Sequence, residues 1–170
     1  MGPYTQGNIS FNVGDHALNV LGNRQQLVQS LNLEECSEVN QVHGDNFIAD
    51  ANATPINNPS LIEADGLATS KPGLGLIIKT ADCQPIMIAS MDGMHIAALH
   101  VGWRGNRINF IDKAIRQFCE SRNLSPSNLV AVRGPSLCPE KSEFINFEAE
   151  WGDQFLPWYN METRTMDLWQ

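Results

Sequence analysis

One turn in the middle of the chain constrains the fold more than any other feature. Asp92-Gly93 separates two apolar runs, residues 84–90 and 94–101. An Asp-Gly pair between such runs is typical of a two-residue β-hairpin loop. Both runs are apolar on both faces, which indicates a hairpin at the buried centre of a sheet. We therefore expect a layered domain built around this hairpin.

The hairpin predicts which side chains become neighbours. If Asp92-Gly93 is the turn, paired positions sum to 185, and His100 lies opposite Pro85. Side chains alternate along a strand, so Cys83 shares a face with Pro85 and becomes a diagonal neighbour of His100, roughly 7–8 Å away at the backbone. A thiolate and an imidazole can bridge that gap to one metal ion with bonds of about 2.0–2.3 Å. A slip of one residue would place them on opposite faces.

A metal ion would need a third ligand from the four histidines, which are His16, His43, His95 and His100. In this register His95 faces away from His100, whereas His43 stands at the end of a strand that is expected within residues 39–47 and ends at Gly44. Two histidines and one cysteine leave one coordination position open, which is typical of catalytic zinc. The alternative is that Cys83 simply packs in the core. Asp82 either caps its turn, orients a histidine or holds a substrate hydroxyl.

The rest of the chain predicts strands alternating with helices. Residues 10–22 fit a short strand and a glycine turn, and residues 23–31 and 106–121 fit helices. Residues 74–80 and 129–132 fit further strands. The pattern indicates one α/β (α+β) layered domain over residues 1–170.

Charge and cysteine usage narrow the function classes. The formal net charge is −8 and no long Lys/Arg cluster occurs, which disfavours a nucleic-acid partner. No run of eighteen apolar residues and no signal peptide are found, so we expect a cytoplasmic protein without a membrane partner. The four cysteines form no C-x-x-C pair and are expected to be free thiols.

The step Gly102-Trp103-Arg104-Gly105 has two interpretations. It is either a tight turn with a packed Trp103 and a solvated Arg104, or an anion pocket. In the second case the glycines let the backbone come close to the anion, and the start of a helix offers free N–H groups. Arg104 and Arg107 add positive charge. A phosphate beside a metal-bound thiolate suits an enzyme that uses a nucleoside or phosphate.

Four motifs follow one another along the chain: Gln41-Val42-His43-Gly44, Ala64-Asp65-Gly66-Leu67-Ala68-Thr69, Thr80-Ala81-Asp82-Cys83-Gln84-Pro85 and His100-Val101-Gly102-Trp103-Arg104-Gly105. In this order they resemble the signature of the YfiH/DUF152 family, which is described both as a multicopper polyphenol oxidase (laccase) and as a purine nucleoside phosphorylase/adenosine deaminase. The resemblance implies a layered αββα sandwich of the YfiH-like fold, shared with a class of cysteine hydrolases.

The resemblance also implies a zinc cofactor held by His43, Cys83 and His100. In a zinc enzyme of this kind we expect Arg104 and Arg24 to bind phosphate or ribose, and Asp82 to assist proton transfer or to orient a ligand. The implied reactions are phosphorolysis of adenosine, inosine, guanosine and methylthioadenosine, and deamination of adenosine. Copper is the alternative metal. Four histidines are too few for a blue-copper site plus a trinuclear cluster, which weighs against a multicopper laccase.

The sequence departs from the family pattern at Arg133, where an aliphatic residue is usual, and at Cys138, where a glycine is usual. The chain also stops at Gln170, before the family's C-terminal segment, so we expect a truncated domain. Three other functions stay open: a copper-linked phenol oxidase with Met87 as a distant ligand, a metal-free cysteine hydrolase with Cys83 as nucleophile and His100 as base, and a non-catalytic binding module. A homo-oligomer is also open.

Overall fold

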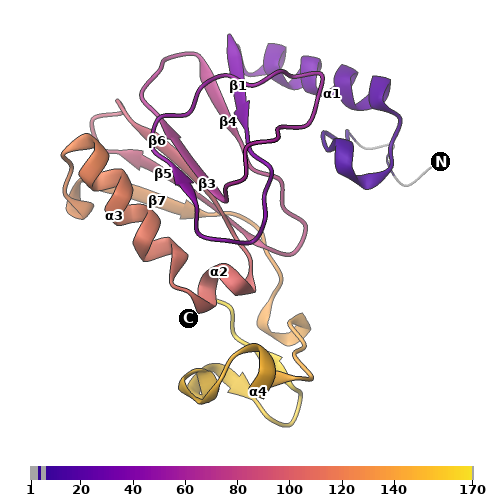
Figure 1. Ribbon diagram of the computed structural model, residues 1–170, viewed down its shortest axis with the longest axis vertical. Coiled ribbons are helices and arrows are strands. Elements are labelled where there is room, and N and C mark those ends of the chain that lie inside the picture. Colours follow the sequence, from indigo (N-terminus) through magenta and orange to yellow (C-terminus); the bar gives the residue numbers. More distant parts are fainter. Residues whose placement is uncertain (1–3, 5–6, 170) are drawn as a thin grey trace.

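The computed structural model describes residue 4 and residues 7–169. They form a larger layered part and a smaller C-terminal lobe, residues 139–169 (Figure 1). The main elements are helix α1 (Ala17–Ser30), strands β1 (Glu35–Glu38), β2 (Phe47–Ile48), β3 (Gly66–Thr69), β4 (Leu74–Ile77), β5 (Gln84–Ser90) and β6 (Ile96–Val101), helices α2 (Trp103–Arg107) and α3 (Phe110–Arg122), strand β7 (Leu129–Arg133), helix α4 (Phe147–Glu150), and strands β8 (Tyr159–Asn160) and β9 (Thr165–Met166). Short 3-10 helices cover Phe11–Val13, Pro126–Asn128, Pro139–Lys141 and Asp153–Trp158.

The predicted hairpin is the centre of a five-stranded sheet with the order β2-β3-β6-β5-β7. Strands β5 and β6 pair antiparallel, and Pro85 lies opposite His100, so the predicted register is confirmed. Gly93 adopts a left-handed backbone conformation with φ of 73°, which the tight turn requires and which glycine adopts at little cost.

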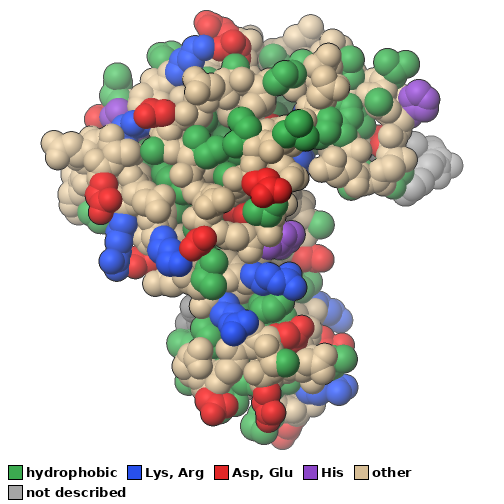
Figure 2. Space-filling model, viewed as in Figure 1, with side chains coloured by type: hydrophobic (Ala, Val, Ile, Leu, Met, Phe, Trp, Pro, Cys, Tyr) green, Lys and Arg blue, Asp and Glu red, His purple; other side chains and the backbone are tan. Residues whose placement is uncertain are grey.

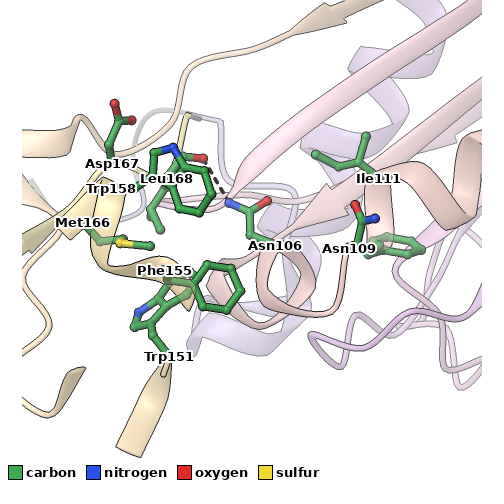
Figure 3. A pocket seen from close by; sticks show the side chains of 10 residues that line it. Asn106, Asn109, Ile111, Trp151, Phe155, Trp158, Met166, Asp167 and Leu168 are labelled. Atoms are coloured by element: carbon green, nitrogen blue, oxygen red, sulfur yellow. Dashed lines mark hydrogen bonds between the residues drawn. The ribbon is translucent and has the colours of Figure 1, made fainter. Parts of the chain in front are cut away.

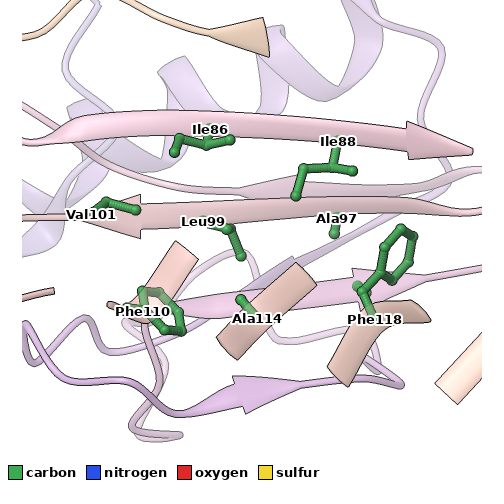
Figure 4. Close-up of a cluster of buried hydrophobic side chains, with 9 residues drawn as sticks. Ile86, Ile88, Ala97, Leu99, Val101, Phe110, Ala114 and Phe118 are labelled. Carbon is green, nitrogen blue, oxygen red and sulfur yellow. The ribbon is translucent and has the colours of Figure 1, made fainter. Parts of the chain in front are cut away.

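Helix α3 covers one face of this sheet. Phe110, Ala114 and Phe118 recur every four residues along α3 and therefore lie on one side of it, against the strands (Figure 4). Leu99 and Ile88 meet them from the sheet. Each large apolar side chain buried in this way contributes about 1.5–3 kcal/mol.

A second, two-stranded sheet of β1 and β4 lies over part of the other face. Leu67 and Ala98 of the large sheet pack there with Val39, and Leu76 of β4 packs against them. Helix α1 flanks β1 and β4 on the outside, and α3 lies on the far side of the molecule (Figure 1). The layer order is therefore helix, sheet, sheet, helix, as the αββα expectation requires.

The expectation that both hairpin faces are buried is wrong for β5. Met87 is 50% exposed, and its neighbour Val132 on β7 is 56% exposed. Strand β6 is buried on both faces because the β1–β4 sheet covers it. Among the described residues, that small sheet leaves the outer half of β5 and β7 uncovered.

Two expected strands are wrong, and one expected helix is divided in two. Residues 10–22 form a 3-10 helix and the start of α1 instead of a strand, because Ser10 caps the first turn and Gly14 ends it with φ of 86°. Residues 39–47 are mostly a loop, because His43 takes a left-handed conformation with φ of 59°. The expected helix over 106–121 is divided into α2 and α3 by Asn109, which has φ of 57°.

The C-terminal lobe packs against the layered part through aromatic side chains. Trp103 contacts Phe144 and Trp151, with ring centroids 5.7 Å apart in both pairs. Asn106 of α2 donates to the carbonyl of Leu168 at 3.0 Å, beside a small pocket shared by the two parts (Figure 3). The lobe therefore holds the start of α2, which only Gly102 separates from the last strand residue of the hairpin.

Candidate metal centre

His43, Cys83 and His100 meet at one point, and their potential ligand atoms all lie within 4.8 Å of one another. His100 is near the end of β6, Cys83 immediately precedes β5, and His43 lies in the loop between β1 and β2. The two imidazole rings are 4.8 Å apart at an angle of 80°. The structure thus brings together Cys83 and His100, which the hairpin register selected, and His43, which was expected as the third ligand.

Gly102 leaves the space in which the cluster forms. A Cβ atom at this position would lie 2.9 Å from Cδ2 of His43 and 3.1 Å from Sγ of Cys83. Gly102 follows β6 directly and precedes α2. The absence of a side chain here therefore lets the loop of His43 and the turn of Cys83 approach the end of β6.

Asp65 connects two of the three segments. Its carboxylate is fully buried and accepts a hydrogen bond from Nδ1 of His100 at 2.7 Å. It also accepts from the backbone N–H groups of His43 at 3.0 Å and Gly44 at 2.7 Å. Because Nδ1 of His100 is engaged, Nε2 is the ring nitrogen left for an ion, which is the usual carboxylate–histidine–metal arrangement.

Gln41 connects the loop of His43 to the segment before Cys83. Its side-chain amide donates to the carbonyl of Lys79 at 2.7 Å and accepts from the Lys79 N–H at 2.8 Å. This double hydrogen bond ties the loop that carries His43 to the segment that leads to Cys83. Together, Asp65 and Gln41 hold all three residues of the cluster in place.

The pKa values of His100 and His43 are shifted in opposite directions. Burial alone would lower the pKa of His100, but the hydrogen bond to Asp65 and the neighbouring Cys83 outweigh it and raise that pKa to about 9. Burial lowers the pKa of His43, and the positive charges of His100 and Arg104 lower it further. His43 is therefore neutral at pH 7, which is the form that binds metals, whereas a metal must displace a proton from His100.

We expect the metal-free protein to lose stability as the pH rises from about 6.5 to about 9. Because the folded-state pKa of His100 is raised from 6.5 to about 9, its contribution to the free energy of unfolding is complete below pH 6.5 and is lost as the pH rises through 9. Urea unfolding of chelator-treated wild type and His100→Gln across this range measures the contribution. The difference in the free energy of unfolding between the two proteins should become smaller as the pH rises. A difference that stays constant or grows contradicts the raised pKa of His100.

A cavity of about 350 Å³ opens beside the cluster. The residues that line this cavity are Asn12, Asn40, Gln41, His43, Lys79, Thr80, Ala81, Asp82, Cys83 and His100. Among them, Asp82 has an exposed side chain. A cavity of this size is within the range of small-molecule sites, about 300–1,000 Å³. Over the face shown in Figure 2, acidic and basic side chains are interspersed.

The two arginines expected to bind phosphate have different placements. Arg104 is exposed on α2, with its guanidinium 4.4 Å from the Trp103 ring centroid, and its charge acts on His43. Arg24 is only 2% exposed and donates from two nitrogens to the carboxylate of Glu38 at 2.8 and 2.9 Å. A third nitrogen of Arg24 donates to the carbonyl of Ile9. The expectation for Arg24 is thus corrected: its guanidinium is occupied by protein groups and supports β1.

A family model described as multi-copper polyphenol oxidoreductase laccase matches residues 1–170. The chain belongs to this family. Its resemblance to the YfiH/DUF152 family is thereby confirmed. Among curated relatives, the purine nucleoside phosphorylase of Rickettsia conorii is 35% identical over 124 residues, which are 73% of this chain and 49% of that protein. That of Xylella fastidiosa strain Temecula1 is 35% identical over 140 residues, 81% of this chain and 52% of that protein.

Two solved structures share the fold. The crystal structure of a Neisseria meningitidis protein of the DUF152 family matches with a TM-score of 0.72 and 26% identity, over 85% of this chain and 56% of that one. YlmD from Geobacillus stearothermophilus matches with a TM-score of 0.77 and 23% identity, over 95% of this chain and 62% of that one. The chain spans about half the length of the curated relatives it matches. In the part that the structure describes, no helix is long and apolar enough to cross a membrane.

Proposed function

We propose that His43, Cys83 and His100 hold one zinc ion in a purine nucleoside phosphorylase-type enzyme. The observation that carries this proposal is the convergence of three metal-binding side chains from three separate segments within 4.8 Å. Imidazole and thiolate together suit zinc, and tetrahedral bonds of about 2.0–2.3 Å hold donor atoms about 3.5 Å apart. The cluster would contract by about 1 Å at its widest pair to reach that geometry.

Other features of the site also fit a bound ion. Gly102 leaves the approach to the cluster free of a side chain. Asp65 fixes the orientation of His100, as carboxylates commonly do for metal-bound histidines. A set of three protein ligands leaves one position for water or substrate, so a bound zinc ion would supply a Lewis acid and an activated water.

The proposed reactions are phosphorolysis of adenosine, inosine, guanosine and methylthioadenosine, and deamination of adenosine. The names of the curated relatives support the phosphorolysis. The cavity beside the cluster would hold the nucleoside and phosphate, and Arg104 would add positive charge near His43. Asp82, on the cavity wall, would exchange a proton with the purine base. A cytoplasmic location is proposed with these reactions.

Zinc content and nucleoside turnover test the proposal together. We expect about one zinc per chain in wild type by mass spectrometry, and almost none in Cys83→Ser, because serine replaces the thiolate that zinc prefers. Cys138→Ser is the matched control: Cys138 is partly buried like Cys83, and it is outside the cluster. Release of free base from inosine with phosphate should follow the zinc content in all three proteins.

The possible results separate the metal from the reaction. A zinc content that is unchanged in Cys83→Ser contradicts the site. A zinc-loaded protein that leaves all four nucleosides intact contradicts the activity while supporting the site. Copper that replaces zinc after growth in copper would favour the phenol oxidase that the family description names.

One observation favours a metal-free cysteine hydrolase as the second candidate. Asp65, His100 and Cys83 form a chain in which a buried carboxylate orients an imidazole next to a thiol, as in a nucleophilic triad. His43 takes no part in such a triad. Alkylation of Cys83 by iodoacetamide, with and without zinc, distinguishes the two functions. Protection by zinc supports the metal site, and equal alkylation supports the hydrolase.

A further inference from the structure

The cavity wall beside the cluster contains one lysine, Lys79, whose charge has no role in the metal site. Lys79 lies between β4 and Cys83, and its side chain is 17% exposed. It lines the cavity together with uncharged polar residues such as Asn12 and Thr80. Neither Arg24 nor Arg104 is among the lining residues that the structure describes.

The ammonium group of Lys79 contacts Glu38, but it does not neutralise that carboxylate alone. Glu38 already accepts two hydrogen bonds from Arg24, and both of these residues are 2% exposed. Two cations therefore share one buried anion, so the group of three carries a net charge of +1. The excess positive charge belongs at the outer member, Lys79, because it alone of the three lines the cavity.

Lys79 is also held at a defined place. Gln41 binds both backbone polar groups of Lys79, and Glu38 contacts its Nζ. An ammonium group has three N–H donors, and within the described part of the chain Glu38 takes one. The other donors can face the cavity. Apart from the residues of the metal cluster, the only other charged side chain on this wall that the structure describes is Asp82, which is exposed, so that water and salt weaken its field.

We propose that Lys79 binds the phosphate oxyanion that attacks the nucleoside, and that Arg24 acts only through Glu38, as a positioning residue for Lys79. This inference rests on the proposed phosphorolysis and assigns its anion subsite. Lysine binds phosphate as a compact charge. In the attack, a phosphate oxygen forms a bond to C1′ of the ribose as the bond from C1′ to the purine nitrogen breaks, and the base leaves with that electron pair and takes up a proton.

The test measures phosphate binding and turnover separately in the full chain loaded with zinc. Calorimetric titration with inorganic phosphate should show about ten- to hundredfold weaker binding in Lys79→Met, as expected for loss of one charged hydrogen bond. The KM for phosphate should rise by a similar factor, whereas the KM for inosine should change less than about twofold. Lys79→Arg should recover most of the phosphate affinity because it keeps the charge.

Lys71→Met is the matched control, because Lys71 also pairs with a glutamate and does not line the cavity. Thermal unfolding checks that each variant is folded, and Lys79→Gln provides a second neutral variant if Lys79→Met is not. Wild-type phosphate affinity in a folded neutral variant overturns the assignment of Lys79 alone. Turnover of nucleosides without phosphate binding by wild type, or no turnover at all, overturns the proposed phosphorolysis.

Discussion

The Gly102→Ala variant is expected to lose zinc binding at the His43, Cys83 and His100 cluster while it keeps its fold. An alanine Cβ would lie 2.9 Å from His43 and 3.1 Å from Cys83, and contacts this short force the neighbouring atoms to move. Both neighbours are proposed ligands, so the strain falls directly on the metal geometry. Metal sites tolerate displacements of only about 0.5 Å. We expect the zinc affinity to fall at least about tenfold, or about 1.4 kcal/mol.

The backbone at Gly102 makes this an informative substitution. Its φ of −79° and ψ of 176° are extended values that alanine adopts freely, so the effect comes from the contacts and not from backbone strain. Gly22→Ala is the matched control, because Gly22 lies in α1 with no atom within 4 Å of an added Cβ. Competition with a chromophoric chelator measures the affinities, and circular dichroism checks the fold. Wild-type zinc affinity in Gly102→Ala would show that the ion does not use this cluster.

Local turn chemistry made the centre of the fold predictable. The Asp92-Gly93 turn alone set the β5–β6 register, and this register placed Cys83 and His100 on one face before any long-range contact was known. The strand ends were less predictable. His43 was expected at the end of a strand, yet its left-handed backbone makes a turn there.

The supporting residues of the site could not be assigned from local patterns. Asp65 and His100 are 35 positions apart in the chain, and Gln41 and Lys79 are 38 apart. Gln41 and Asp65 lie inside the motifs that carry the family resemblance, but a motif does not show which partner a side chain meets. Arg24 was misassigned for the same reason, since nothing near it in the sequence reveals that Glu38 occupies its guanidinium.

The long-range hydrogen bonds of Asp65 and Gln41 hold the three ligand segments together. Each proposed ligand comes from a segment that could move independently: a loop, a turn and a strand end. Asp65 joins the loop of His43 to His100, and Gln41 joins the same loop to the segment before Cys83. Because the Asp65 side chain is hydrogen-bonded to both of its segments and the Gln41 side chain makes two hydrogen bonds to Lys79, the cluster is organised before a metal arrives, which reduces the entropy lost on binding.

Asp65→Asn is expected to weaken zinc binding by about 10- to 100-fold, the range typical of losing a residue that orients a metal-bound histidine. The carboxylate accepts from His100, His43 and Gly44 at once. Burial would raise the pKa of Asp65, but these hydrogen bonds hold it below its ordinary value of 3.8, so the group is ionised in the folded protein. An amide has no negative charge and presents an NH₂ group to one of these donors.

The same substitution has a spectroscopic signature that general destabilisation would not produce. Because the hydrogen bond to Asp65 helps to raise the pKa of His100 to about 9, that pKa should fall in metal-free Asp65→Asn, as followed by NMR of the imidazole protons. Asp45→Asn is the matched control, since Asp45 lies in the same loop as His43 but pairs with Lys113 at the surface. If Asp65→Asn keeps both the zinc affinity and the raised pKa of His100, then Asp65 does not organise the site, and the His43 loop must be held by Gln41 alone.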